Sequence, residues 1–211
     1  MTKLDSFQLR KAIPQEEFDY MLLRGVLSDY EAVRQKINEL LKSEVIIRVK
    51  KGLYVFGPEY NNVPVCREVL ANLIYGPSCI SLEFALAYHS LIPDRVHTIT
   101  SVTPKRDKQF DTPLGKFSYR YLSPNKYPHG IEQIWIDDKH PVFMASPEKA
   151  LIDYLTLNRV PPFTNMEAAR QFLQFDLRIE KEDLKRIDPE ALLKLNIFYR
   201  NPSVYRIMEV L

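Results

Sequence analysis

The stretch IIRVKKGLYVF, residues 46–56, consists of two apolar runs on either side of a short basic turn that ends in glycine. Two such runs separated by a turn that contains glycine predict a β-hairpin. Lys50 and Lys51 then stand at its tip, beside Gly52. What this hairpin is for depends on the segments that precede it in the chain.

Residues 4–25 predict two short helices ahead of the hairpin. Pro14 suits the first turn of the second helix, where the N–H that proline lacks would have no partner in any case. Phe18, Met21 and Leu22 then recur at helical spacing. This spacing predicts a buried stripe along the second helix.

Residues 28–44, SDYEAVRQKINELLKSE, have the clearest helical pattern of this region. Ser28 and Glu31 match the S-x-x-E capping box, which satisfies free N–H groups at the start of a helix. The apolar residues that share one face are Val33, Ile37, Leu40 and Leu41. The residues that lie largely elsewhere, and are expected to be exposed, are Tyr30, Arg34, Gln35, Asn38 and Lys42.

Three helices followed by a hairpin is the element order of a winged helix-turn-helix domain, which we expect for residues 1–60. In that fold the third helix lies in the major groove of DNA and the hairpin, called the wing, contacts the backbone or the minor groove. The whole chain has 29 basic and 27 acidic residues, so any basic signal must be local. The segment from Arg34 to Lys51 contains six basic and two acidic residues.

Both kinds of DNA contact are available in this segment. Lysines at the hairpin tip would neutralise phosphates without reading sequence, and Arg34, Gln35 and Asn38 have the donors and acceptors that read base edges. The predicted DNA-binding residues are Tyr30, Arg34, Gln35, Asn38, Lys42, Arg48, Lys50 and Lys51. Asp29 and Glu31, in the first turn of the predicted helix, would repel phosphate, so a module for protein contacts remains the alternative.

Residues 61–211 predict a mixed α+β domain after a linker near 57–64, so the expected fold class is α+β throughout. Ser146 and Pro147 have the residue types of an N-cap and a first helical position. Helices are expected in 65–75, 81–91 and 146–159, and three more in 166–211. Strands are expected in 97–103, 115–123, 131–138 and 141–146, with a charged loop at 104–114.

No cofactor or catalytic signature stands out. The six glycines form no phosphate-binding loop or dinucleotide fingerprint, and the four histidines lack the spacing of metal ligands. Cys66 and Cys79 are expected to be reduced packing residues, and His89 a hydrogen-bonded packing residue. Glu148 and Lys149 are read as structural, with Glu148 favouring the start of its helix. We therefore expect no enzyme, no cofactor and no metal.

One enzymatic alternative stays open. Asp94, Asp137 and Lys139 supply two carboxylates and a lysine, the groups that a Mg²⁺-dependent nuclease of the PD-(D/E)xK kind needs to hold metal and steady the attacking water. The pattern is short. A turn aspartate and a hairpin loop, DDKHP, account for the same residues.

Three stretches carry a family resemblance: IIRVKKGLYVF at 46–56, CISLEFALAYHSLI at 79–92 and ASPEKALIDYL at 145–155. With these, most of the chain resembles the AbiEi-type antitoxins of bacterial type IV toxin–antitoxin and abortive-infection systems. The resemblance implies a winged N-terminal domain that represses its own operon, with DNA contacts at Arg34, Asn38, Lys50 and Lys51. It also implies a C-terminal domain that counteracts a nucleotidyltransferase-like toxin. A stand-alone winged-helix regulator would have the same features.

The expected partners are double-stranded DNA of the chain's own promoter, a second copy of the chain on that DNA, and a cognate toxin. The N-terminal stretch is polar and lacks the apolar segment of a signal peptide. No run of about 18 apolar residues is present for a membrane-spanning helix. We expect a cytoplasmic protein with no membrane partner.

Overall fold

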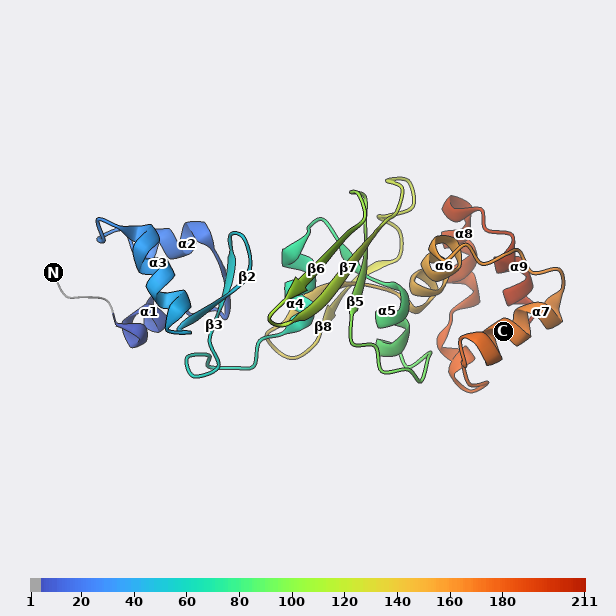
Figure 1. The fold of residues 1–211 in the computed structure, drawn as a ribbon. Coiled ribbons are helices and arrows are strands. Elements are labelled where there is room, and N and C mark those ends of the chain that lie inside the picture. Colours follow the sequence, from blue (N-terminus) through green and yellow to red (C-terminus); the bar gives the residue numbers. More distant parts are fainter. Residues whose placement is uncertain (1–4) are drawn as a thin grey trace. The chain divides into compact units, whose positions relative to one another are not determined.

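The computed structural model describes residues 5–211, and the chain forms two compact units (Figure 1). The N-terminal unit comprises the chain up to Leu70 together with Thr112–Leu114, and the C-terminal unit comprises Ala71–Asp111 and Gly115–Leu211. Residues 1–4, part of the stretch assessed above for a signal peptide, lie outside the described residues. The expected mixed α+β class is confirmed, since both helices and strands occur in each unit.

The N-terminal unit packs three helices on a small antiparallel sheet whose strand order is β1-β3-β2. Its elements, in chain order, are α1 (Ser6–Ala12), β1 (Glu17–Asp19), α2 (Tyr20–Val26), α3 (Val33–Lys42), β2 (Ile46–Lys50) and β3 (Leu53–Phe56). The predicted hairpin is therefore confirmed. The core of this unit draws on every one of these elements, with Leu9, Phe18, Leu23, Ile37, Ile46 and Phe56 among its buried side chains.

The second predicted helix starts later than expected. Phe18 belongs to strand β1, where it pairs with Tyr54 of β3, and its ring lies 4.9 Å from that of Phe56. Pro14 precedes this strand rather than opening a helix, and Met21 is 66% exposed rather than buried. The helical spacing was misleading because β1 is held by pairing with a strand more than thirty residues further on.

The predicted capping box at Ser28 and Glu31 is wrong. The backbone N–H of Ser28 donates to the carbonyl of Gly25, so Ser28 belongs to the turn that ends α2. Helix α3 begins at Val33, and Ala32 at its N-cap supplies no side-chain hydrogen bond.

A buried ion pair fixes the turn between α1 and β1. The Arg10 guanidinium donates to the Glu16 carboxylate at 2.6 Å and to the carbonyl oxygen of Ile13 at 2.7 Å. The same Glu16 oxygen accepts the backbone N–H groups of Asn62 and Val63 at 3.0 and 3.3 Å. The pair thus ties the first helix to the segment that follows β3.

The C-terminal unit is built on a six-stranded mixed sheet with the order β6-β7-β5-β4-β9-β8. Its strands are β4 (Cys79–Ile80), β5 (Ile99–Thr103), β6 (Lys108–Thr112), β7 (Gly115–Tyr121), β8 (Ile131–Trp135) and β9 (Pro141–Ala145). Four of these match the predicted strands. Strand β6 lies where a charged loop was expected, because this edge strand leaves most of its side chains exposed and carries little apolar signal.

Helices cover this sheet and continue beyond it (Figure 1). They are α4 (Arg67–Ile74), α5 (Leu82–Tyr88), α6 (Pro147–Leu157), α7 (Met166–Gln171), α8 (Pro189–Tyr199) and α9 (Ser203–Met208). A π-helical turn, Phe172–Asp176, extends α7, and a short 3₁₀-helix, Asp183–Arg186, precedes α8. The helices predicted for this half of the chain are confirmed. None of the described helices has the length and apolar character needed to cross a membrane.

The two cysteines are packing residues, as predicted. Both are buried and neither forms a disulfide. Burial raises the pKa of the Cys66 thiol to about 11 and that of Cys79 further still. Both thiols are therefore protonated at neutral pH, which makes them poor nucleophiles.

Helix α6 starts as its sequence indicates, with Pro147 in its first turn and the Ser146 hydroxyl accepting the Lys149 N–H at 3.2 Å. Glu148 is buried. Its carboxylate accepts the Ser146 hydroxyl at 2.7 Å and the backbone N–H of Asp188 at 2.8 Å, at the residue that caps α8. The structural role predicted for Glu148 is confirmed, with α8 as a partner that the sequence did not indicate.

Lys149 and Asp153, one turn apart on α6, have fully buried side chains. The Lys149 ammonium lies 3.3 Å from the Asp153 carboxylate and donates to the hydroxyl of Tyr199, on α8, at 2.9 Å. The Tyr199 hydroxyl and the Ser81 hydroxyl, the latter at 2.7 Å, both donate to Asp153. These four residues, here called the buried network, connect α6 to α8 and to the start of α5.

Replacing Lys149 by methionine tests this network, because methionine fills a similar volume without the charge. The variant leaves the Asp153 carboxylate buried without its cation, so unfolding free energy should fall by about 3–5 kcal/mol. Urea unfolding followed by the fluorescence of Trp135, the chain's single tryptophan and part of the C-terminal unit, measures the change.

Lys194→Met is the matched control. Lys194 lies in the same unit, in an exposed ion pair with Glu190 at 3.7 Å, and its replacement should change stability by no more than about 0.5 kcal/mol. If Lys149→Met is no more destabilising than this control, the buried network does not hold the helices together.

Candidate nucleic-acid interface

The four residues of α3 that are predicted to contact DNA lie on one exposed face of this helix. Successive helical residues are rotated by about 100°, so Arg34, Asn38, Lys42 and Gln35 fall within about 100° of the helix circumference. All four are exposed. The opposite face carries Ile37 and Leu40, which are buried in the core of the N-terminal unit. The core therefore determines which face of α3 meets solvent.

Most of these side chains have no partner in the described part of the protein. Among residues 5–211, none forms a hydrogen bond or ion pair with the side chain of Arg34, Asn38 or Lys42. Gln35 differs, because its amide donates to Glu39 at 3.3 Å. The face thus keeps two cations and one amide available to an external ligand.

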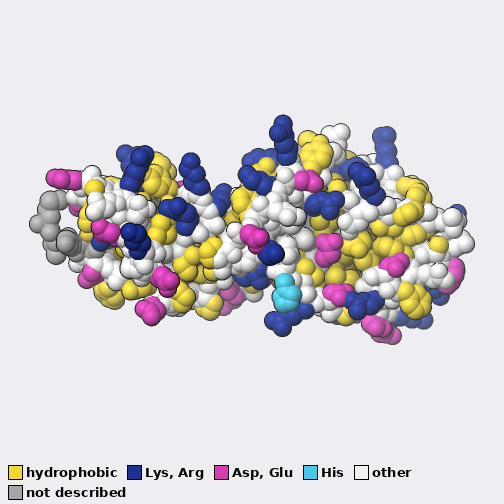
Figure 2. All heavy atoms as spheres, in the orientation of Figure 1, with side chains coloured by type: hydrophobic (Ala, Val, Ile, Leu, Met, Phe, Trp, Pro, Cys, Tyr) yellow, Lys and Arg dark blue, Asp and Glu magenta, His cyan; other side chains and the backbone are white. Residues whose placement is uncertain are grey.

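The hairpin tip is a tight turn. Lys50 of β2 is paired with Leu53 of β3, which leaves only Lys51 and Gly52 in the turn. Gly52 has φ +86°, a conformation that side chains with a Cβ rarely adopt. Lys51 is exposed and Lys50 half-buried. Figure 2 shows Lys and Arg side chains on one face of this unit.

Tyr30 lies in another setting than expected, whereas Arg48 lies on the predicted hairpin. Tyr30 precedes α3 instead of lying on it, and it packs half-buried against the core, with the Lys36 ammonium 5.4 Å from its ring centroid. Arg48, on β2, is exposed, and its guanidinium lies 5.8 Å from the ring centroid of Tyr54. Tyr30 is thus in part a packing residue.

The acidic residues expected in the first turn of the reading helix are not there. Asp29 and Glu31 are exposed in the segment before Val33, and the first turn of α3 contains no acidic residue. The acidic residue within α3 is Glu39, which is engaged by Gln35 and by Lys36, at 3.8 Å. The two carboxylates therefore lie just before α3 and not within its first turn.

The two aspartates of the nuclease alternative each have their own partner. Asp94 forms an ion pair with Arg178. Asp137 accepts a hydrogen bond from His140 at 2.7 Å, which lowers the pKa of the Asp137 carboxyl, and it accepts the N–H of Lys139 at 2.9 Å. Within residues 5–211, no group of three or more His, Cys, Asp or Glu side chains is arranged to hold a metal ion.

The remaining histidine prediction is confirmed. A ring nitrogen of His89 lies 2.8 Å from the carbonyl oxygen of Ala145, at the end of β9. The residue joins α5 to strand β9 as a hydrogen-bonded packing side chain.

No family model matches the chain, and no curated protein matches it with significant similarity.

Proposed function

We propose that the chain is a DNA-binding transcriptional repressor that reads its operator with α3. The observation that carries the proposal is the exposed face of α3, with Arg34 and Asn38 available to a ligand, beside a hairpin tipped with Lys50 and Lys51. The element order α1-β1-α2-α3-β2-β3, with the sheet order β1-β3-β2, supports a winged helix-turn-helix. In such a domain α3 enters the major groove and the β2–β3 hairpin acts as the wing.

The positions of the residues on α3 suit the two kinds of contact. Arg34 is the second residue of α3 and Asn38 follows one turn later, a separation of about 6 Å along the axis. Residues near the start of a recognition helix contact base edges. Arginine pairs with guanine and asparagine with adenine in bidentate geometry. Lys42, Arg48, Lys50 and Lys51 would contact phosphates.

We further propose that the repressor is the antitoxin of a type IV system, whose C-terminal unit opposes a nucleotidyltransferase-like toxin. The support is the resemblance carried by three stretches, which form β2 with β3, β4 with α5, and the start of α6. Each of them contributes buried residues to its unit. The alternative function is that of a stand-alone transcriptional regulator. The antitoxin differs from it in having a cognate toxin that it inhibits.

The repressor proposal is tested by titrating the full chain against its own upstream DNA. The readout is fluorescence anisotropy at two salt concentrations with scrambled DNA as competitor. Tight, salt-dependent binding that prefers the upstream sequence is expected, with two copies on a palindromic or repeated site. An arm with Mg²⁺ should leave the DNA intact. Cleavage that Asp137→Asn abolishes would replace the repressor by the nuclease alternative.

The wing is tested by the double variant Lys50→Ala with Lys51→Ala. Binding should weaken equally on specific and scrambled DNA, and the slope of log K against log salt should become shallower by about 1 for each phosphate that a lysine had neutralised. The matched control is Lys181→Ala with Lys185→Ala, which removes the same charge from exposed sites of the C-terminal unit. A slope that is the same in both double variants would show that the hairpin tip does not contact DNA.

Arg34→Ala tests sequence reading. Without its bidentate hydrogen bonds to one base, discrimination at that base pair should fall by about 1–3 kcal/mol. Competition with operators carrying single base changes measures this. Lys42→Ala, on the same face of α3, should instead weaken all sequences alike. If Arg34→Ala also weakens all sequences alike, Arg34 contacts phosphate and the reading role is wrong.

The antitoxin assignment predicts that the chain restores growth to cells expressing a nucleotidyltransferase-like protein encoded beside its gene. The Lys50→Ala, Lys51→Ala variant should rescue growth as well as the unaltered chain does, because DNA binding and toxin antagonism are assigned to different units. Colony counts with toxin and chain under separate promoters measure the effect. Failure of the unaltered chain to rescue would leave the stand-alone regulator.

A further inference from the structure

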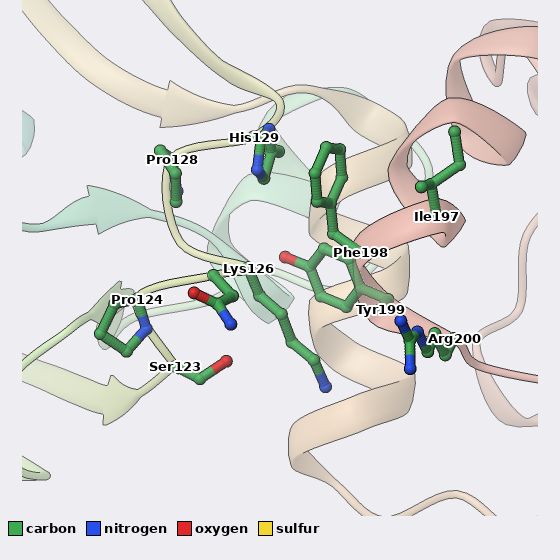
Figure 3. A pocket seen from close by; sticks show the side chains of 10 residues that line it. Ser123, Pro124, Lys126, Pro128, His129, Ile197, Phe198, Tyr199 and Arg200 are labelled. Atoms are coloured by element: carbon green, nitrogen blue, oxygen red, sulfur yellow. The ribbon is translucent and has the colours of Figure 1, made fainter.

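The C-terminal unit contains a pocket that the DNA-binding proposal does not use (Figure 3). Its volume is about 720 Å³, within the range of small-molecule sites. It lies between the loop that follows β7 and the C-terminal end of α8. Its lining residues are Ser123, Pro124, Asn125, Lys126, Pro128, His129, Ile197, Phe198, Tyr199 and Arg200.

One end of the pocket is cationic. Lys126 and Arg200 are in its wall, which contains no acidic residue. Among the described residues, no carboxylate forms an ion pair with either side chain. Cations close by in the sequence are paired, Lys194 with Glu190 and Arg206 with Glu209. The two pocket cations are therefore left for a ligand of opposite charge.

The other end is aromatic. The rings of His129 and Phe198 stack with centroids 3.4 Å apart and an angle of 11° between their planes. Phe198 remains 42% exposed. Figure 3 shows His129 and Phe198 side by side, with the charged ends of Lys126 and Arg200 at the opposite end of the pocket. A ligand that carries both a planar ring and an anion would match the two ends.

Tyr199 lies between these two ends of the pocket (Figure 3). Tyr199 is buried, and its hydroxyl is held by Lys149 and Asp153 of the buried network. Burial, with the Asp153 carboxylate adding to it, raises the pKa of the Tyr199 phenol far above its usual range. The phenol therefore stays neutral and adds no negative charge to the pocket. The Lys126 ammonium lies 5.5 Å from the Tyr199 ring centroid.

Arg200 has a positive φ, as do five other non-glycine residues in the described part of the chain. It caps α8 in the left-handed region, with φ 51° and ψ 40°, where glycine is the ordinary residue. A residue with a Cβ is less favourable than glycine in that conformation. Favourable interaction of the cation with the helix C-terminus offsets part of this.

We propose that this pocket binds a small phosphorylated ligand with a planar ring, the chemistry of a nucleoside monophosphate. The phosphate would lie between Lys126 and Arg200, within reach of the polar groups of Ser123 and Asn125, and the ring would lie against the His129–Phe198 pair. Arginine and lysine suit phosphate by charge and hydrogen bonding, and stacking on aromatic rings tolerates any base. The site is independent of DNA binding by α3.

Isothermal titration of the full chain tests the proposal with three probes: a nucleoside monophosphate of each base, the matching nucleosides, and inorganic phosphate. At least one monophosphate should bind at least tenfold more tightly than its nucleoside and than phosphate alone. A 5′-phosphorylated single-stranded oligonucleotide forms a fourth arm. Binding of the oligonucleotide without binding of any monophosphate would overturn the proposal.

Variants assign the binding to the pocket. Arg200→Gly removes the side chain while supplying the residue that the left-handed cap prefers, so loss of fold does not explain loss of binding. Arg200→Gly and Lys126→Gln should each weaken monophosphate binding at least tenfold. Lys194→Gln, on the outer part of α8 and outside the pocket lining, should leave it unchanged.

Phe198→Leu separates the two ends of the pocket. It should weaken the monophosphate at least tenfold and leave inorganic phosphate unchanged. Three results would overturn the assignment: no monophosphate binding at millimolar concentration, unchanged binding by Arg200→Gly and Lys126→Gln, or equal affinity for phosphate and every monophosphate.

Discussion

A lysine ammonium buried without solvent must be compensated, and this requirement at Lys149 organises the C-terminal unit. Its compensating groups are contributed by other turns and elements: Asp153 one turn along α6, Tyr199 at the end of α8, and Ser81 acting through Asp153 from the start of α5. Buried ion pairs add little net stability compared with apolar packing. This one links α5, α6 and α8 through hydrogen bonds to a single charged pair.

The N-terminal unit uses the same kind of constraint on a smaller scale. Arg10 and Glu16 satisfy backbone groups at the turn after α1 and at Asn62 and Val63. The sheet and the helices then enclose the core that buries Ile37. Because that residue and its neighbours face inward, the polar side of α3 faces solvent. The candidate DNA surface is thus a consequence of core packing and not of any interaction among the surface residues themselves.

The sequence predicted those elements whose signals are local. The basic hairpin and the start of α6 at Ser146 depend on residues within a few positions of one another, and both were confirmed. Strand β1 was misread as helix because Phe18 is held by Tyr54, far along the chain. The capping box at Ser28 failed because the turn that ends α2 uses the same residue. At these two places the local sequence is compatible with more than one backbone structure, and contacts with other parts of the chain determine which one forms.

The same distinction separates the two candidate sites. The face of α3 and the hairpin tip come from one continuous stretch, Arg34 to Lys51, so composition and helical period were enough to indicate them. The pocket combines Lys126 and His129 with Phe198 and Arg200, about seventy positions later. In the sequence each of these is an ordinary residue of a loop or a helix end. They line one pocket at the end of α8, where the buried network holds Tyr199. A surface that one continuous stretch of sequence forms can therefore be predicted from the sequence. A pocket formed by segments that are distant in the sequence can be identified only once the fold is known.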